Sequence, residues 1–280
     1  MNNLRFFHTF WTKPMRESRI TVNMLIFALS YTYARKMGAQ IVLHTDQLGK
    51  QILKDIPYDE VYTDLEHINS NINKFWAYGK LYATSQEPLG AIHIDGDVFL
   101  KNPKLKELFT QQHDLLTQSE EDDKWRLDQT YTLSQQVITQ QNLPDYLHIN
   151  YPNAYNCGVV QFKNQELKDR YLKSYFEIVD KSIKDPTFHE RYNYFQTYYQ
   201  QHGAVIPDIV AEQQILHELA QNYKTATILK GDIYEDAKNK GYIHYLTTVK
   251  YQKQEYFTLW LNKINPRLLH SLRHNKYFKQ

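Results

Sequence analysis

The sequence predicts an α/β protein in which helices flank a mostly parallel β-sheet. An apolar run at 4–10, a helical run at 20–36 and a second apolar run at 39–44 follow one another along the chain. This order is the βαβ pattern of a parallel sheet. A further short apolar run at 89–94, directly before two carboxylates, is typical of a buried central strand.

The two carboxylates, Asp95 and Asp97, stand at the carboxyl end of that predicted strand. In open parallel sheets this end is where ligands bind. A charged pair between apolar neighbours is costly to bury unless it binds a cation or accepts hydrogen bonds. We therefore predict a metal site here, with a solvated turn as the alternative. Gly96 is expected to let the backbone turn between the acids.

Composition limits the class of protein. The chain has 280 residues, 42% of them hydrophobic, and a net charge of +2. This suits a globular protein of one large domain or two small ones, and it does not imply a nucleic-acid partner. No run approaches the ~20 apolar residues that span a bilayer, and the first residues do not resemble a secretory signal. We expect a cytoplasmic protein. The single cysteine, Cys157, is interpreted as a small core residue.

The rest of the chain alternates strand and helix patterns with one interruption. Residues 118–153 lose periodicity and contain an acidic cluster at 120–123, which favours a surface insertion or a lid. Strands are expected at 60–63, 114–117, 155–162 and 243–246, and helices at 74–85, 103–109, 167–183, 191–199 and 210–222.

Three charged or titratable side chains have a structural interpretation, and two of them, Lys80 and His244, also have a functional one. Lys80, on the helix at 74–85, is either a solvated lysine of the helix face or a phosphate ligand. Glu212 lies in the first turn of a predicted helix, where the helix dipole favours an acid. His244 is either a satisfied core histidine or, beside the two acids, the nitrogen ligand of a site suited to Mn²⁺ and less well to Mg²⁺.

Four stretches, in this order, resemble the retaining nucleotide-sugar glycosyltransferases of the GT-A fold grouped as family 8. Ile94-Asp95-Gly96-Asp97 is similar to their Asp-x-Asp motif. Asn156-Cys157-Gly158-Val159 is similar to their Asn-Ala-Gly-Val, and Glu212-Gln213 stands where they have Asp-Gln. His244 and Lys250 keep their His-x5-Lys spacing. The resemblance spans residues 4–250 and rests on about a dozen positions.

The resemblance implies a GT-A-like, Rossmann-type sheet and a role for particular residues. By it, Asp95, Asp97 and His244 would hold the metal, and Lys250 would bind the diphosphate. The other implied roles concern the donor and the reacting centre. Donor binding is implied for Thr9, Trp11, Lys80, Asp95, Asn156 and Gly158, and a place beside the donor sugar or acceptor for Glu212 and Gln213.

The sequence also departs from the family 8 pattern. Thr247 replaces the glycine usual between the histidine and the lysine, and no Pro-Trp follows Lys250. Residues 9–14 differ from the opening of that family. The sugar-transferring relatives of family 32, which carry Asp-x-Asp on a similar sheet, fit the pattern as well.

The expected function is metal-dependent transfer of a hexose from a nucleotide sugar, with UDP as the nucleotide, to a glycan or lipid-linked acceptor. A divalent ion and Lys250 would stabilise the charge of the leaving diphosphate. An inverting enzyme would also need a carboxylate base, for which Asp208 and Glu212 are the candidates. The resemblance favours retention instead, with Gln213 near the reacting carbon.

Two other functions compete with this one. A sugar nucleotidyltransferase would need a glycine-rich, basic loop after the first strand to hold a triphosphate, and residues 10–14 contain no glycine. A non-catalytic nucleotide-sugar-binding or scaffold protein would keep the fold without turnover.

We predict one glycosyltransferase domain at 1–262 and a basic amphipathic tail at 263–280. Leucines recur in the tail at helical spacing, so it either packs them on the domain or contacts anionic lipid. The second interpretation predicts peripheral association with the inner face of the membrane. Five basic residues and no acid lie in the tail: Lys263, Arg267, Arg273, Lys276 and Lys279.

Overall fold

The computed structural model describes residues 4–69, 72, 74–122, 130–149, 153–198, 207–245 and 248–279. The chain divides into two compact units. Unit 1 is formed by residues 1–68, 82–112 and 231–280, and unit 2 by residues 69–81 and 113–230.

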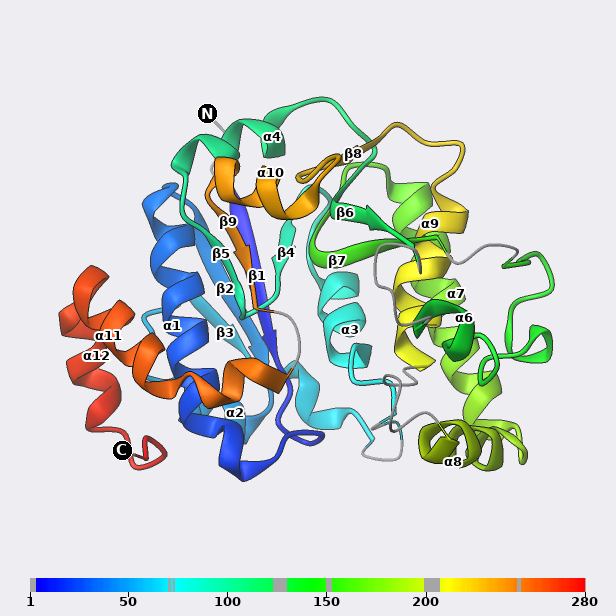
Figure 1. Cartoon of the computed structure of the whole chain (residues 1–280), viewed down its shortest axis with the longest axis horizontal. Helices are drawn as coiled ribbons and strands as arrows, with labels where there is room; N and C mark the ends of the chain where they lie inside the picture. The colour runs from blue at the N-terminus through cyan, green and yellow to red at the C-terminus, as the bar shows by residue number, and fades with distance from the viewer. Residues whose placement is uncertain are drawn as a thin grey trace. The chain divides into compact units, whose positions relative to one another are not determined.

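Four parallel strands form the sheet of unit 1 (Figure 1). Strand β1 (Arg5–Phe10) pairs with β2 (Gln40–Thr45) on one side and with β4 (Ile92–Ile94) on the other. Strand β3 (Glu60–Tyr62) pairs with the far side of β2. The predicted βαβ pattern is confirmed, because the strands that the apolar runs predicted lie side by side in parallel.

Helix α1 (Ile20–Lys36) connects β1 to β2 and has the bounds that its pattern predicted. All its residues from Ile20 to Ala34 are buried, because it packs on β2 and also on the later helix α11 (Gln254–Ile264). Beyond its end, Gly38 has a φ of 74°, the left-handed conformation that glycine adopts at low cost. The predicted glycine C-cap is therefore confirmed.

A small second sheet brings a late segment back to the acid pair. Strand β5 (Val98–Leu100) is antiparallel to β9 (Tyr242–His244), with Val98 opposite His244. Helix α10 (Ile233–Lys240) leads into β9 and ends at Gly241, whose φ is 64°. This register sets His244 next to the residue that follows Asp97, and the Tyr245 amide donates to the Asp97 carbonyl oxygen at 3.1 Å.

The tail continues α11 into a short helix, α12 (Pro266–Arg273), in which the predicted leucines are buried. Leu268, Leu269 and Leu272 are 6%, 1% and 0% exposed. Asn265 caps α12 by accepting from the Leu268 amide at 3.2 Å. The leucine face therefore packs within unit 1, and it is the basic side chains that face solvent.

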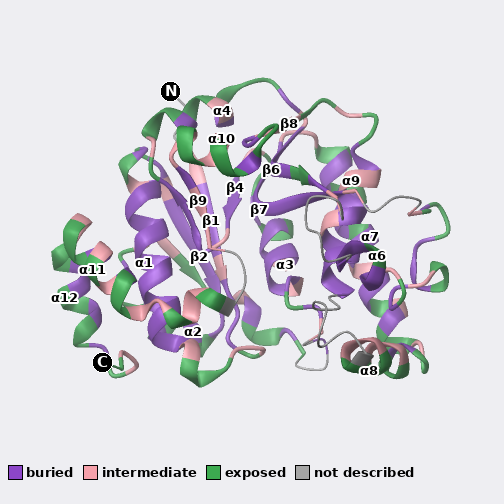
Figure 2. Ribbon diagram, in the orientation of Figure 1, coloured by how far each residue is buried: buried purple, intermediate pink, exposed green. Residues whose placement is uncertain are grey.

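Unit 2 contributes three strands. Strand β7 (Ala154–Phe162) is buried at all nine positions and is antiparallel to β6 (Leu115–Glu121). On its other edge β6 pairs in parallel with β8 (Thr225–Thr227). The strand order is β3-β2-β1-β4 in unit 1 and β7-β6-β8 in unit 2. The strands are mostly parallel, as the sequence predicted, and Figure 2 shows β1, β2 and β7 largely buried.

Helices flank the strands, and some differ from the prediction. The helix expected at 210–222 begins as a π-helical segment (Ile209–Gln214) before α9 (Ile215–Leu219). The segment expected to form a surface insertion instead extends β6 to Glu121 and adds a buried helix, α6 (Thr130–Ser134); its residues 123–129 and 150–152 lie outside the described ranges. The other helices are α2 (Gln47–Ile52), α3 (Tyr78–Gln86), α4 (Lys106–Thr110), α7 (Gln165–Lys184) and α8 (Phe188–Tyr198). None of the described helices is long and apolar enough to cross a membrane.

Candidate functional site

The acid pair of unit 1 meets a histidine. Asp95 follows β4, Asp97 precedes β5, and His244 ends β9. One ligand atom from each of the three lies within 4.8 Å of the others. Asp97 is only 8% exposed. The β5–β9 pairing is what brings His244 to the two acids.

These three side chains suit a divalent cation. The distance from Asp97 Oδ1 to His244 Nε2 is 3.4 Å. Two ligands each about 2.1 Å from one ion, at a right angle, lie roughly 3 Å apart. One imidazole and two carboxylates are a mixed nitrogen and oxygen set that suits Mn²⁺ and, less well, Mg²⁺. The residues therefore fit the metal that the sequence predicted.

Gly96 is required for a different reason from the one expected. It is not among the described glycines with a positive φ, so a special turn conformation does not explain it. A Cβ at this position would lie 2.3 Å from the Phe27 ring of α1, which is far inside van der Waals contact. Glycine therefore allows the acid loop to rest directly on α1.

Lys250 adds a positive charge to this cluster. Its ammonium donates to Asp97 Oδ2, from the 3₁₀ segment Thr248–Gln252 that follows β9. Burial alone would raise the pKa of Asp97, but Lys250 and His244 hold it well below its usual range. Asp97 is therefore a carboxylate at neutral pH. Thr247, where the sequence departs from the family 8 pattern, lies outside the described residues.

Two residues at the carboxyl end of β1 hold buried polar atoms. Thr9 Oγ1 and Trp11 Nε1 are inaccessible to solvent and have no hydrogen-bond partner within the described ranges. The nearby Asp46, by contrast, accepts hydrogen bonds on both carboxylate oxygens. Its donors are the Thr12 amide at 2.8 Å, the Thr12 hydroxyl at 2.7 Å and the Gly49 amide at 2.8 Å. A buried donor without a partner costs about 1–3 kcal/mol.

In unit 2 the predicted Asn156 and Gln213 belong to one hydrogen-bond network. Asn156 Nδ2 donates to Glu121 Oε1 at 2.7 Å. The Tyr131 hydroxyl lies 2.9 Å from Glu121 Oε2 and 3.1 Å from Gln213 Oε1. The Gly158 amide donates to Asn156 Oδ1 at 3.0 Å. Asn156 and Tyr131 thus contact the Glu121 carboxylate, and Tyr131 also contacts Gln213.

Sequence reasoning missed Glu121 and Tyr131. Glu121 is 3% exposed and is the last residue of β6. The rule that identified Asp95, an acid at the carboxyl end of a strand, would have found it had the strand been extended past Thr117. Tyr131 is fully buried and left no comparable signal in the sequence.

Lys80 and Glu212 form a buried ion pair in unit 2. Lys80 Nζ lies 2.7 Å from Glu212 Oε1 and donates to the Cys157 carbonyl oxygen at 2.5 Å. The two side chains are 9% and 1% exposed. Lys80 is therefore not the solvated helix-face lysine that its pattern favoured. To bind a donor phosphate, its ammonium would have to leave both of these partners.

Asp208 is a buried acid whose two carboxylate oxygens both accept hydrogen bonds. Its Oδ2 accepts from the Ala77 amide at 2.6 Å and its Oδ1 from the Tyr175 hydroxyl at 2.8 Å. The side chain is fully buried. Burial raises the pKa of Asp208 to about 8, and the nearby Glu212 contributes to the increase. Asp208 therefore binds a proton at neutral pH, which suits positioning of the backbone before α3 better than proton abstraction.

This pKa predicts a pH dependence of stability. Because the pKa of Asp208 rises from 3.8 to about 8 on folding, the unfolded chain binds fewer protons between these values. Stability is thus lost as pH rises toward 8. Asp208→Asn can still accept from the Ala77 amide through its oxygen, and its NH2 can donate to the Tyr175 hydroxyl oxygen in place of the bond that the acid accepts. Because the amide does not titrate, the variant should flatten the decline between pH 5 and 7 by about 1.4 kcal/mol per pH unit, the slope for one proton. Urea unfolding of both proteins at pH 5, 6 and 7 measures this, and parallel stability curves would contradict it.

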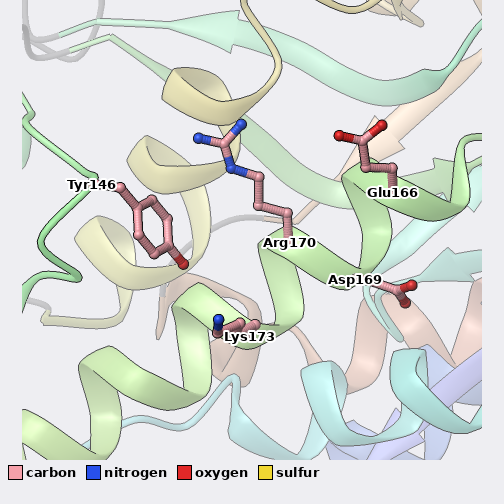
Figure 3. A pocket seen from close by; sticks show the side chains of 5 residues that line it. All are labelled: Tyr146, Glu166, Asp169, Arg170 and Lys173. Carbon is pink, nitrogen blue, oxygen red and sulfur yellow. The ribbon is translucent and has the colours of Figure 1, made fainter.

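A groove along α7 is a separate feature of unit 2. It has a volume of about 410 Å³ and is lined by Tyr146, Glu166, Asp169, Arg170 and Lys173. The Tyr146 ring lies beside Arg170, whose Cζ is 5.5 Å from the ring centre (Figure 3). None of the predicted site residues lines it, so we assign it no part in the chemistry.

Comparison with known proteins identifies a family. The chain belongs to the family described as a family of unknown function, DUF6734, whose pattern matches residues 4–271. No curated protein matches it. Among solved structures it is similar to apo mouse xyloside xylosyltransferase 1, with 11% identity, a TM-score of 0.42, and coverage of 100% of this chain and 94% of that one.

The chain is also similar to the glycosyltransferase GlyE of Streptococcus pneumoniae TIGR4, in its apo form and in a second structure. Identity is 12% and the TM-score is 0.40. The alignment covers 97% of this chain and 64% of GlyE, so the chain spans less than two thirds of that protein. We therefore infer the function from the site residues.

Proposed function

We propose that the protein is a metal-dependent glycosyltransferase that moves a hexose from a nucleotide sugar, with UDP as the nucleotide, to a glycan or lipid-linked acceptor. The observation that carries this proposal is the cluster of Asp95, Asp97 and His244 within 4.8 Å, with the Lys250 ammonium on the same carboxylate. A cation site beside a lysine can stabilise the negative charge that develops on a diphosphate leaving group.

The metal of this proposal is Mn²⁺ or, less well matched, Mg²⁺, held by Asp95, Asp97 and His244. When bound, it supplies Lewis-acid stabilisation of the charge on the departing diphosphate. Lys250 binds the same diphosphate and adds a fixed positive charge. Asp95 keeps the dual role that the resemblance to family 8 implies, as a metal ligand that also faces the donor.

The nucleoside and the sugar are assigned to different residues. Thr9 Oγ1 and Trp11 Nε1 are buried polar atoms without described partners at the end of β1, and we assign these two residues to the nucleoside. Asn156, Gly158 and Gln213 are assigned to the donor sugar. Glu121 joins them, because it orients both Asn156 and, through Tyr131, Gln213.

The burial of the two candidate bases supports retention. An inverting enzyme needs a carboxylate that takes a proton from the acceptor. Glu212 is 1% exposed and paired with Lys80, and Asp208 is fully buried with both oxygens bonded. In a retaining reaction the departing phosphate takes that proton, so neither acid is needed as a base and Gln213 lies near the reacting carbon.

A screen of nucleotide sugars tests the proposal. The protein is incubated with each donor and Mn²⁺, with and without a chelator, and the released nucleoside diphosphate is measured. Release from one donor in Mn²⁺ but not in chelator supports the proposal. Binding of donors without release would indicate the non-catalytic alternative, and release of pyrophosphate from a nucleoside triphosphate and a sugar phosphate would indicate a nucleotidyltransferase.

His244→Ala should weaken Mn²⁺ binding. The variant removes one of three ligands, so we expect a loss of affinity of at least about ten-fold, measured by calorimetric titration of Mn²⁺. The exposed His270→Ala, on α12, is the matched control and should bind Mn²⁺ as the wild type does. Equal affinity of His244→Ala and the wild type for Mn²⁺ would show that His244 is not a metal ligand.

Lipid contact through residues 263–280 stays a prediction that rests on charge alone. The leucines that would enter the lipid are buried within unit 1. The exposed basic residues could still be attracted to anionic headgroups, at about 1 kcal/mol per residue near the surface. The proposed transfer reaction does not depend on this contact.

A further inference from the structure

Lys250 and the expected metal use the same carboxylate. The Lys250 ammonium donates to Asp97 Oδ2, while Asp97 Oδ1 faces His244 Nε2 at 3.4 Å. The side chains of Asp97 and Lys250 are 11% and 17% exposed, so solvent screens the pair only partly. Lys250 thus occupies a carboxylate that a divalent ion would also bind.

The Lys250 ammonium and a divalent cation would compete for the same carboxylates. Asp95 and Asp97 carry two negative charges, and the ammonium of Lys250 balances one of them. A divalent cation on the same carboxylates would place two positive charges beside the ammonium, which repels it. Lysine is a compact charge on a flexible four-carbon chain, so its ammonium can move while the backbone of the 3₁₀ segment stays in place.

We infer that Lys250 is a tethered cation that neutralises Asp97 until a divalent ion binds there, and that the ion then displaces its ammonium toward the donor diphosphate. This inference rests on the proposed function. It implies an order of binding, in which the metal enters first and the diphosphate second. Before the metal enters, the ammonium is held by Asp97 and the acids repel phosphate.

The inference predicts effects of opposite sign for one substitution. Lys250→Met removes the competing cation and should tighten binding of Mn²⁺ alone by about ten-fold, the size of the coupling between close charge pairs. The same variant should weaken binding of UDP in saturating Mn²⁺ by about ten-fold, because the diphosphate loses its lysine. If Lys250 served only to stabilise the fold, Lys250→Met would lower the affinity for both Mn²⁺ and UDP.

Calorimetric titration of Mn²⁺, and of UDP in excess Mn²⁺, tests both effects. Lys250→Arg keeps the positive charge and should bind Mn²⁺ within about two-fold of the wild type. Lys253→Met removes a neighbouring lysine whose ammonium lies 5.3 Å from the Tyr245 ring centre, and it should change neither affinity. Melting temperatures of all variants verify that they are folded.

A second measurement needs no variant. Reductive methylation of the wild-type protein, followed by mass spectrometry, compares the reactivity of Lys250 with that of Lys253. Lys250 should be protected in the absence of metal, become several-fold more reactive in Mn²⁺, and be protected again in Mn²⁺ with UDP. Unchanged protection of Lys250 on addition of Mn²⁺ would overturn the inference.

The outcomes separate the inference from the proposed function. If the wild type binds Mn²⁺ and Lys250→Met binds it equally or more weakly, the inference fails and the metal site stands. If neither protein binds Mn²⁺, both the inference and the proposed metal site fail. Tighter Mn²⁺ binding together with weaker UDP binding is the expected result.

Discussion

Asp97→Asn is expected to reduce sugar transfer by about a thousand-fold. The carboxylate is the shared partner of His244 and Lys250, and the amide has lost the charge that binds a divalent ion. Loss of about 4 kcal/mol of transition-state stabilisation corresponds to a factor of this size. The melting temperature should fall by no more than a few degrees, because the substitution keeps the shape of the side chain. Lys250, which is 17% exposed and flexible, can turn its ammonium to solvent.

Initial rates of nucleoside diphosphate release, measured in Mn²⁺ with the preferred donor, determine the effect. Asp236→Asn on α10 makes the same chemical change at a helix-surface ion pair with Lys240, and it should leave the rate unchanged. Turnover of Asp97→Asn at the wild-type rate would show that Asp97 has no role in the reaction.

Lys80→Met is expected to destabilise the protein by about 3–5 kcal/mol, because it leaves the Glu212 carboxylate buried without its partner. The pair lies 2.7 Å apart, with Lys80 9% and Glu212 1% exposed. The Cys157 carbonyl oxygen also loses a donor. Urea unfolding at neutral pH measures the free energy of unfolding of the variant and the wild type.

Two further variants identify the cause of that loss. Lys80→Met combined with Glu212→Gln removes the uncompensated charge and should recover most of the stability. Lys173→Met, at an exposed lysine of α7, makes the same change outside any buried pair and should stay within about 0.5 kcal/mol of the wild type. If Lys80→Met lost less than about 1 kcal/mol, the buried ion pair would not be the main role of Lys80.

The sheet of unit 1 was predictable because its signals are local. The strands and α1 are set by apolar runs and by a glycine just past the helix end, all of which can be recognised within a few residues. The two acids were found for the same reason, since they directly follow an apolar strand. The need for Gly96 was predicted, but its cause was not, because the Phe27 ring comes from a distant helix.

The partners of site residues could not be predicted from local patterns. Lys250 and Asp97 are 153 positions apart, and only the β5–β9 register joins them. The spacing of the helix at 74–85 favours a solvated Lys80, because it does not reveal Glu212, which lies on the π-helical segment. Glu121 is not predicted as a site residue, because the polar residues at the end of β6 interrupt the apolar pattern and the predicted strand stops at 117. In each case a long-range contact decides the role of the residue.

The most direct test of the metal site is the affinity of the protein for UDP in Mn²⁺ and in a chelator. The account predicts tight binding in Mn²⁺ and binding at least about ten-fold weaker in the chelator, because the acids then repel the diphosphate and Lys250 remains on Asp97. Equal affinity for UDP under the two conditions would contradict it.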